Sequence, residues 1–106
     1  MSRIAYVNGR YVPHRLAEVA MEDRGYQFAD GIYEVIVFFN RKMLDETLHL
    51  KRLKQSLDSL KIAAPMPEAA LKLVIRELIT RNNYKDGYIY MQITRGVAPR
   101  NHPFPK

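Results

Sequence analysis

Cysteine is absent from this chain of 106 residues, which excludes disulfides and thiolate metal sites. The N-terminal region has no long apolar run, so the sequence indicates neither a signal peptide nor a membrane span. Internal repeats and low-complexity segments are also missing. We therefore expect a cytoplasmic protein without a membrane partner, and the length allows one domain at most.

Charge is unbalanced but not clustered. Seventeen Lys and Arg residues against 11 Asp and Glu residues give a formal net charge of +6. This excess suits nucleic acid, an acidic membrane surface or small anionic ligands. The basic residues do not form a run of five or more like charges, so a solvated basic surface is the simplest alternative. Hydrophobic residues make up 47% of the chain, which is typical of a globular domain.

Two hairpins are predicted in the first part of the chain. Asn8-Gly9 favours a two-residue turn between strands at 3–7 and 10–12, because both residues tolerate positive φ. Residues 14–31 are expected to be irregular to weakly helical. Residues 33–39 are apolar at successive positions, which predicts a central strand covered on both faces, with a short return strand at 42–44.

Two helices are predicted next, over residues 45–62 and 67–82. Asp45 or Thr47 can cap the first helix, and Pro67 fits the first turn of the second. Apolar residues at spacings of three and four predict the buried stripes. These are Leu50, Leu53, Leu57 and Leu60 in the first helix, and Leu71, Val74, Ile75 and Leu78 in the second.

A last strand is predicted over residues 88–95, where Ile89, Met91 and Ile93 alternate with polar and aromatic residues. The order is therefore two hairpins, two helices and one strand. This order predicts an α+β fold in which two helices pack on a mainly antiparallel sheet.

Three groups of residues are candidates for chemistry. In the segment 23–35, either the charges satisfy backbone donors of a turn, or Tyr33 directs its phenol into a pocket at the mouth of the sheet. On the first predicted helix, His49 and Arg52 are three residues apart and lie near one another. They form either an exposed basic face or a phosphate contact through Arg52.

The third group is Arg100-Asn101-His102, in a stretch without an acidic residue. Side chains at i and i+2 of an extended segment point the same way, so Arg100 and His102 can converge on one carboxylate. A flexible basic tail is the alternative. Three prolines, at 99, 103 and 105, stiffen the segment and favour a preformed anion site.

The motifs in these three regions resemble those of a known family. They are Asp-Arg-Gly-Tyr-Gln-Phe-x-Asp-Gly-x-Tyr-Glu-Val at 23–35, His-x-x-Arg-Leu at 49–53 and Tyr-x-Gln-x-Thr-Arg-Gly-x-x-Pro-Arg-x-His-x-Phe-Pro at 90–105. In this order and at these intervals they resemble the N-terminal part of the fold-type IV, pyridoxal-phosphate-dependent transaminases. The Pro-Arg-x-His segment favours the branch that acts on D-amino acids.

The resemblance implies pyridoxal 5'-phosphate as cofactor and transamination between D-amino acids and 2-oxo acids. It implies that Arg52 binds the cofactor phosphate and that Tyr33, Arg100 and His102 bind the substrate α-carboxylate. In the family the arginine and histidine reach across a subunit interface, so a homodimer is implied. The family's Schiff-base lysine lies beyond the Pro-Arg-x-His segment, so we expect residues 1–106 to be a truncated N-terminal small domain, inactive without the C-terminal domain.

Other functions stay open at this point. An aminodeoxychorismate lyase and a branched-chain aminotransferase share the motifs of the superfamily, and a non-catalytic dimerisation module is also compatible. Residues 85–93 loosely resemble the strand of an RNA-recognition domain. Such domains follow a βαββαβ order, which two consecutive helices do not fit, so we expect no nucleic-acid partner.

Overall fold

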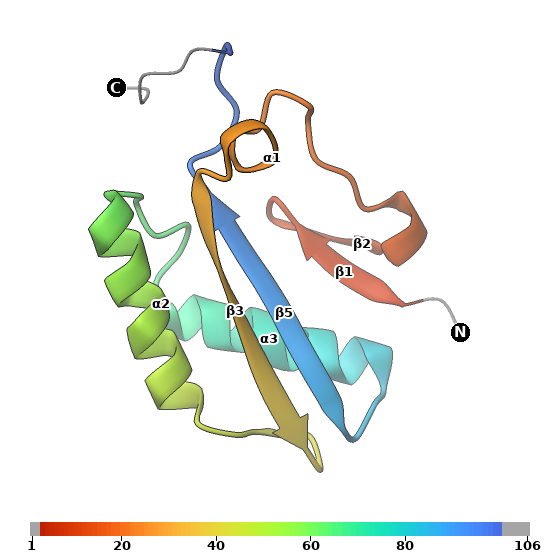
Figure 1. Ribbon diagram of the computed structural model, residues 1–106. Helices are drawn as coiled ribbons and strands as arrows, with labels where there is room; N and C mark the ends of the chain where they lie inside the picture. The colour runs from red at the N-terminus through yellow and green to blue at the C-terminus, as the bar shows by residue number, and fades with distance from the viewer. Residues whose placement is uncertain (1–2, 101–106) are drawn as a thin grey trace.

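The computed structural model describes residues 3–100. Their elements are β1 (Ile4–Val7), β2 (Arg10–Pro13), a 3-10 turn (His14–Leu16), α1 (Arg24–Phe28), β3 (Gly31–Phe39), β4 (Lys42–Met43), α2 (Glu46–Leu60), α3 (Glu68–Asn82) and β5 (Gly87–Thr94). The α+β fold expected from the sequence, two helices on an antiparallel sheet, is confirmed (Figure 1).

The described strands form two separate antiparallel sheets. One is the hairpin β1-β2, whose turn at Asn8-Gly9 has positive φ at both residues. The other has the order β4-β3-β5, with Gly31 to Phe38 of β3 paired to Thr94 to Gly87 of β5. Because β4 pairs only with Phe38 and Phe39, no described strand flanks the rest of β3 on that side. Helix α2 approaches β3 there.

The core lies between the three-stranded sheet and helices α2 and α3. Side chains from both helices meet the inward residues of β3, and Ile36 and Ile75 are almost completely buried. Partly buried residues of β5 complete the core on the same face, and they are the three predicted from the alternation, Ile89, Met91 and Ile93. At about 25 cal/mol per Å² of apolar area, this layer is the main source of stability.

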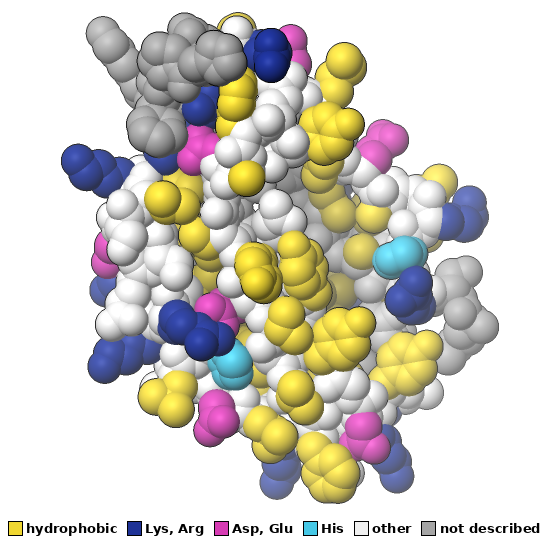
Figure 2. Space-filling model, in the orientation of Figure 1, with side chains coloured by type: hydrophobic (Ala, Val, Ile, Leu, Met, Phe, Trp, Pro, Cys, Tyr) yellow, Lys and Arg dark blue, Asp and Glu magenta, His cyan; other side chains and the backbone are white. Residues whose placement is uncertain are grey.

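The other face of the sheet is open, which corrects the expectation of a strand covered on both faces. Inward residues of β3 are buried while its outward neighbours are exposed. Both helices pack on one side, and the outward aromatic rings partly cover one another instead, as where Tyr33 stacks on Tyr90 at 6.0 Å. Figure 2 shows hydrophobic side chains gathered over this face, which include Tyr33, Val35, Val37, Phe39, Tyr88 and Tyr90.

The helix ends differ slightly from the prediction. Helix α2 begins at Glu46, and Asp45 precedes it in a left-handed conformation without a side-chain cap, although its carbonyl accepts a hydrogen bond from the His49 amide. Pro67 is the N-cap residue of α3 and lies just outside the first turn. Leu60, predicted to be buried, is in the last turn of α2 and more than a third exposed.

Helix α3 also holds the N-terminal hairpin. The Asn82 side chain accepts a hydrogen bond from the Ile4 amide at 2.8 Å and donates one to the Ile4 carbonyl at 3.0 Å. Next to it, the Arg81 guanidinium lies 4.1 Å from the centre of the Tyr11 ring. The hairpin is therefore fixed to the last turn of α3.

No helix among residues 3–100 is long and apolar enough to span a membrane.

Candidate functional site

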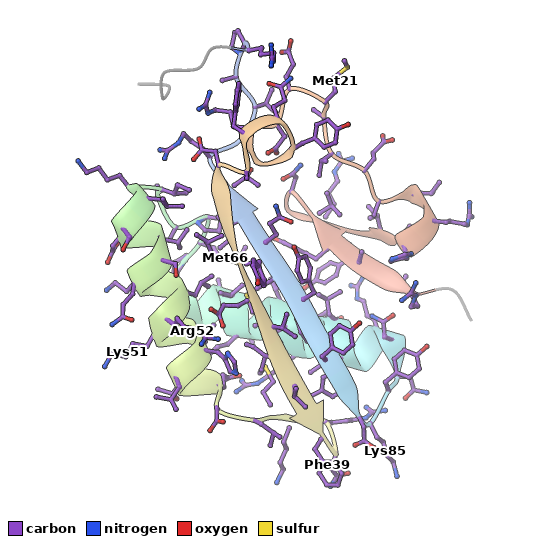
Figure 3. The ribbon with its side chains drawn as sticks, viewed as in Figure 1. Met21, Phe39, Lys51, Arg52, Met66 and Lys85 are labelled. Atoms are coloured by element: carbon purple, nitrogen blue, oxygen red, sulfur yellow. The ribbon has the colours of Figure 1, made fainter. Side chains whose placement is uncertain are left out.

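Arg52 lies on the side of α2 that faces β3, at the part of β3 without a neighbouring strand. Figure 3 shows Arg52 directed toward the sheet, whereas its neighbour Lys51 points away from it. The two elements border an open cleft of about 390 Å³, lined by Tyr33, Glu34, Val35 and Arg52. Two of the four predicted site residues, Tyr33 and Arg52, therefore lie in one cleft.

Glu34 orients the Arg52 guanidinium through two parallel hydrogen bonds. Arg52 Nε donates to Glu34 Oε2 and Nη2 donates to Oε1, both at 2.8 Å. The two ends differ in exposure, because the Arg52 side chain is 64% exposed and the Glu34 side chain only 5%. This paired geometry uses one edge of the guanidinium and leaves Nη1 on the exposed side.

Glu34 lies on the covered side of β3, in line with Ile36 and Phe38, so its charge has to be compensated. Hydrogen bonds from Arg52 lower the pKa of Glu34 below its ordinary value, and they outweigh burial, which acts in the opposite direction. A further hydrogen bond from His49 adds to the lowering. The hydrogen bond to Glu34, together with the Glu34 charge, raises the pKa of Arg52. Glu34 is therefore ionised at neutral pH.

His49 completes this group from one turn earlier on α2. Its Nδ1 lies 2.9 Å from Glu34 Oε1 and 3.4 Å from Arg52 Nη2. An ionised carboxylate only accepts hydrogen bonds, so Nδ1 carries the proton that it donates to Glu34. A protonated Nδ1 cannot also accept from Arg52, and the longer contact is therefore not a hydrogen bond. His49 and Arg52 share Glu34 as their common acceptor.

The cleft residues fit one side of a phosphate group of the cofactor that the motifs imply. A fixed guanidinium with an exposed edge is a suitable donor for phosphate oxygens, and the Tyr33 phenol in the same cleft is a donor for a second anionic group. Glu34 already offsets the charge of Arg52, so a phosphate dianion needs further donors besides this guanidinium. The described residues hold no group of three or more His, Asp or Glu side chains arranged for a metal ion.

Arg100 lies apart from this cleft. The chain leaves β5 beside α1 (Figure 1), and the Arg100 guanidinium is 5.6 Å from the centre of the Phe28 ring at the end of α1. The structure therefore does not bring Arg100 together with Tyr33 and Arg52 of the same chain. His102 lies outside the described residues.

A second buried carboxylate stands where the chain turns toward Arg100. Asp30 Oδ2 accepts a hydrogen bond from Arg24 Nε at 2.8 Å and another from Arg95 Nε at 2.7 Å. Burial alone raises the pKa of Asp30, but the two arginines together outweigh it and the pKa lies below its ordinary value. The same Arg95 donates to the carbonyls of Leu60 and Lys61 at the end of α2.

The sequence pattern did not single out Glu34 or Asp30 as partners of particular arginines. A signal for Glu34 was present, because a carboxylate at a buried position of an apolar strand requires a cation. The spacing of His49 and Arg52 placed two basic side chains on one face of a helix, but it did not place that face against Glu34. No comparable spacing exists for Asp30, whose partner Arg95 is 65 residues away in the sequence.

Comparison with known proteins agrees with the motifs. Residues 31–106 match the family described as amino-transferase class IV. The chain is 43% identical over 100 residues to a D-alanine aminotransferase of Staphylococcus haemolyticus. That alignment covers 94% of this chain and 36% of the relative, so the chain spans about a third of the length of the curated relative.

Solved structures share the fold. A branched-chain amino acid aminotransferase of Escherichia coli superposes with a TM-score of 0.89 at 19% identity, over 99% of this chain and 36% of that one. A 4-amino-4-deoxychorismate lyase of Pseudomonas aeruginosa gives 0.68 at 29% identity, over 85% and 32%. The motifs, the fold and the matched residues lead to the same conclusion: the chain belongs to the class IV aminotransferase family.

Proposed function

We propose that this chain supplies the cofactor-phosphate contact and part of the carboxylate site of an aminotransferase that interconverts D-amino acids and 2-oxo acids. The observation that carries the proposal is the Arg52 guanidinium, held by Glu34 on one edge and exposed on the other, beside Tyr33 in the same cleft. Membership of the class IV family and the similarity to a D-alanine aminotransferase support it.

In this proposal Arg52 donates to the phosphate of pyridoxal 5'-phosphate, and Glu34 holds it in the direction required. When bound, this cofactor acts as an electron sink during cleavage of the Cα–H bond of the amino acid. Tyr33 donates a hydrogen bond from its phenol O–H to the α-carboxylate of the substrate from the same cleft. Arg100 binds that carboxylate through two parallel N–H donors, and His102 adds one further donor. Fixing the carboxylate determines which face of the α-carbon is presented for reaction.

The proposal includes a homodimer in which Arg100 and His102 serve the cleft of the partner subunit. It is supported by the position of Arg100 beside Phe28, because Arg100 is not among the residues that line the cleft of its own chain. Both substrates of transamination carry an α-carboxylate, so one such trap serves both halves of the reaction. An assembly of this kind requires a two-fold symmetric interface.

Mixed dimers test this arrangement. In the complete enzyme, Arg52→Ala and Arg100→Ala are each expected to be nearly inactive at substrate concentrations near the wild-type KM. If Arg100 acts in the partner's cleft, each mixed dimer contains one cleft with both arginines intact, so random mixing restores about a quarter of the wild-type activity. If Arg100 acts in its own cleft, mixing restores none. Size-exclusion chromatography with light scattering shows whether the subunits form dimers at all.

Substrate choice is tested by steady-state kinetics with D-alanine, L-leucine and 2-oxoglutarate. We expect turnover with the D-amino acid, and Arg100→Ala should raise its KM strongly because the carboxylate loses a charged bidentate partner. Preference for L-leucine would replace the D-specific assignment with a branched-chain one. Unchanged kinetics in Arg100→Ala would remove that residue from the site.

An aminodeoxychorismate lyase is the second candidate, because one such lyase of known structure shares the fold at 29% sequence identity. The test is incubation with 4-amino-4-deoxychorismate in the absence of a 2-oxo acid. Product formation without an amino-group acceptor would favour the lyase. Strict dependence on a 2-oxo acid would favour the aminotransferase.

A further inference from the structure

The buried Asp30 cluster joins three elements at the end of the sheet from which the chain leads to Arg100. Asp30 precedes β3, Arg24 begins α1, and Arg95 follows β5. The side chains of Asp30 and Arg24 are 5% and 3% exposed, and that of Arg95 is 15% exposed. One carboxylate oxygen therefore joins the segment after β5 to two segments near the start of β3, about 65 residues earlier in the sequence, and solvent hardly reaches it.

Backbone hydrogen bonds hold the segment after β5 in the same place. The Arg95 amide donates to the Asp30 carbonyl at 3.0 Å, and the Arg24 amide donates to the Gly96 carbonyl at 2.8 Å. The Ala98 amide reaches the Glu22 carbonyl at 3.3 Å, and Asp23 forms a β-bridge with Val97. Residues 95–98 thus run along the segment that leads into α1.

Two glycines allow this close approach. A Cβ atom at Gly31 would lie 2.7 Å from the Ile93 carbonyl oxygen, and one at Gly25 would overlap the Thr94 side chain. Gly96 has a φ of +102°, which directs the chain away from the line of β5, and a Cβ atom at this position would meet no other atom within 4 Å. The path from Thr94 to Arg100 is therefore determined by the close packing at Gly25 and Gly31, by the charges of the Asp30 cluster, and by the backbone conformation of Gly96.

We propose that Asp30, through Arg24 and Arg95, is a positioning residue that sets where Arg100 is presented for carboxylate binding. Asp30 does not touch the substrate. It fixes residues 95–98, and Arg100 follows two residues later beside Phe28, a ring that the Arg24 guanidinium also contacts at 4.7 Å. This inference rests on the proposed role of Arg100 and adds a separate residue, on a different element, that controls it.

The experiment compares wild-type enzyme with Asp30→Asn, which keeps the shape of the side chain and removes its charge. Hydrogen exchange should become about tenfold faster or more at the amides of Arg24, Arg95 and Ala98, because the segment opens more easily. The KM for D-alanine and the KM for 2-oxoglutarate should both rise about tenfold, since each substrate has an α-carboxylate. The kcat and the affinity for pyridoxal 5'-phosphate should stay within about twofold.

Two further variants keep the test decisive. Glu77→Gln neutralises the exposed carboxylate that pairs with Arg81 on α3, and it should change none of these readouts. Gly96→Ala redirects the same segment from its backbone without entering the core, and it should raise both KM values even if Asp30→Asn does not fold.

Two outcomes would overturn the inference. The first is unchanged hydrogen exchange together with unchanged KM values in a folded Asp30→Asn variant. If Asp30→Asn does not fold, unchanged KM values in Gly96→Ala take its place. The second is a loss of kcat and cofactor affinity at constant KM, which is the pattern of general destabilisation. Hydrogen exchange is measured without turnover. A wild-type enzyme that is inactive toward D-alanine would therefore reject the proposed function, and hydrogen exchange would still show whether Asp30 holds residues 95–98 in place.

Discussion

Asp30 and Glu34 stand four residues apart in the sequence, one just before β3 and one within it, and each is bound by two cationic or polar side chains. Their surroundings differ in one respect. The Arg24 side chain that binds Asp30 is 3% exposed, whereas the Arg52 side chain that binds Glu34 is 64% exposed. The first carboxylate joins parts of the protein to one another, and the second presents a cation to solvent.

The contrast separates two uses of the same chemistry. An arginine that is enclosed by protein donates its hydrogen bonds to internal acceptors. Arg95, for example, donates to Asp30 and to the Leu60 carbonyl at the end of α2. An arginine held along one edge at the surface keeps the other edge for a ligand. Removing Asp30 should therefore cost mainly stability and geometry, and removing Glu34 should cost mainly the direction of Arg52.

The largest expected effect is on stability at Asp30. Asp30→Asn should lower the free energy of unfolding by about 3–5 kcal/mol, because buried guanidinium groups lose their counter-charge. Glu34→Gln should cost about 1–2 kcal/mol, since Arg52 can turn toward water. Urea titration followed by circular dichroism measures both. Equal losses in the two variants would contradict the comparison, and Glu77→Gln, in an exposed pair, serves as the reference.

The next effect concerns the cofactor. Arg52→Lys should weaken binding of pyridoxal 5'-phosphate in the complete enzyme about 10- to 100-fold, because an ammonium cannot bind Glu34 and a phosphate through two flat edges at once. Absorbance titration of the cofactor-free enzyme measures this. Lys51→Ala is the matched control, since Lys51 precedes Arg52 but points away from the sheet. An equal change in both variants would mean that the loss is not specific to the guanidinium beside Glu34.

Acid should remove the stabilisation that the Asp30 and Glu34 carboxylates provide. The pKa values of Asp30 and Glu34 are lowered from ordinary values of 3.8 and 4.5, so their contribution to stability is complete above those values and is lost as the pH falls through the folded-state pKa values. Unfolding free energy measured from pH 6 down to pH 2 should therefore decline below about pH 4.5. The decline should be shallower in Asp30→Asn. An identical slope in that variant would show that other groups control acid unfolding.

The smallest effect is expected at His49. His49→Gln should reduce cofactor affinity no more than about threefold, because Arg52 keeps both hydrogen bonds to Glu34. The same absorbance titration measures it. A loss as large as that of Arg52→Lys would mean that the imidazole, and not Glu34, determines where the guanidinium points.

The sequence predicted the fold well because its elements are marked locally. Asn8-Gly9 fixes the first hairpin, and the leucine spacing fixes α2. The covered face of β3 was harder to predict, since Tyr33, Val35 and Val37 are as apolar as a buried residue and nonetheless lie on the open face. Periodicity indicates which residues share a face, but the packing of both helices on one side decides which face is covered.

The site was predicted only in part, for a physical reason. Tyr33 and Arg52 were identified from their motifs, and the structure places both in one cleft. Their roles, and those of Arg100 and His102, stay predictions. The two carboxylates that hold the arginines could not be assigned to their partners, because pairs such as Asp30 with Arg95 depend on tertiary contacts between distant segments.

The contact between Asn82 and Ile4 has a consequence for biosynthesis. The first strand forms two hydrogen bonds, one donated and one accepted, with a residue 78 positions later in the sequence. While the ribosome is still making the middle of the polypeptide, the hairpin at the beginning has no such partner, and an isolated two-stranded hairpin is only marginally stable in water. The start of the chain should therefore become ordered only after the last turn of α3 has emerged, and until then it is open to chaperones and proteases.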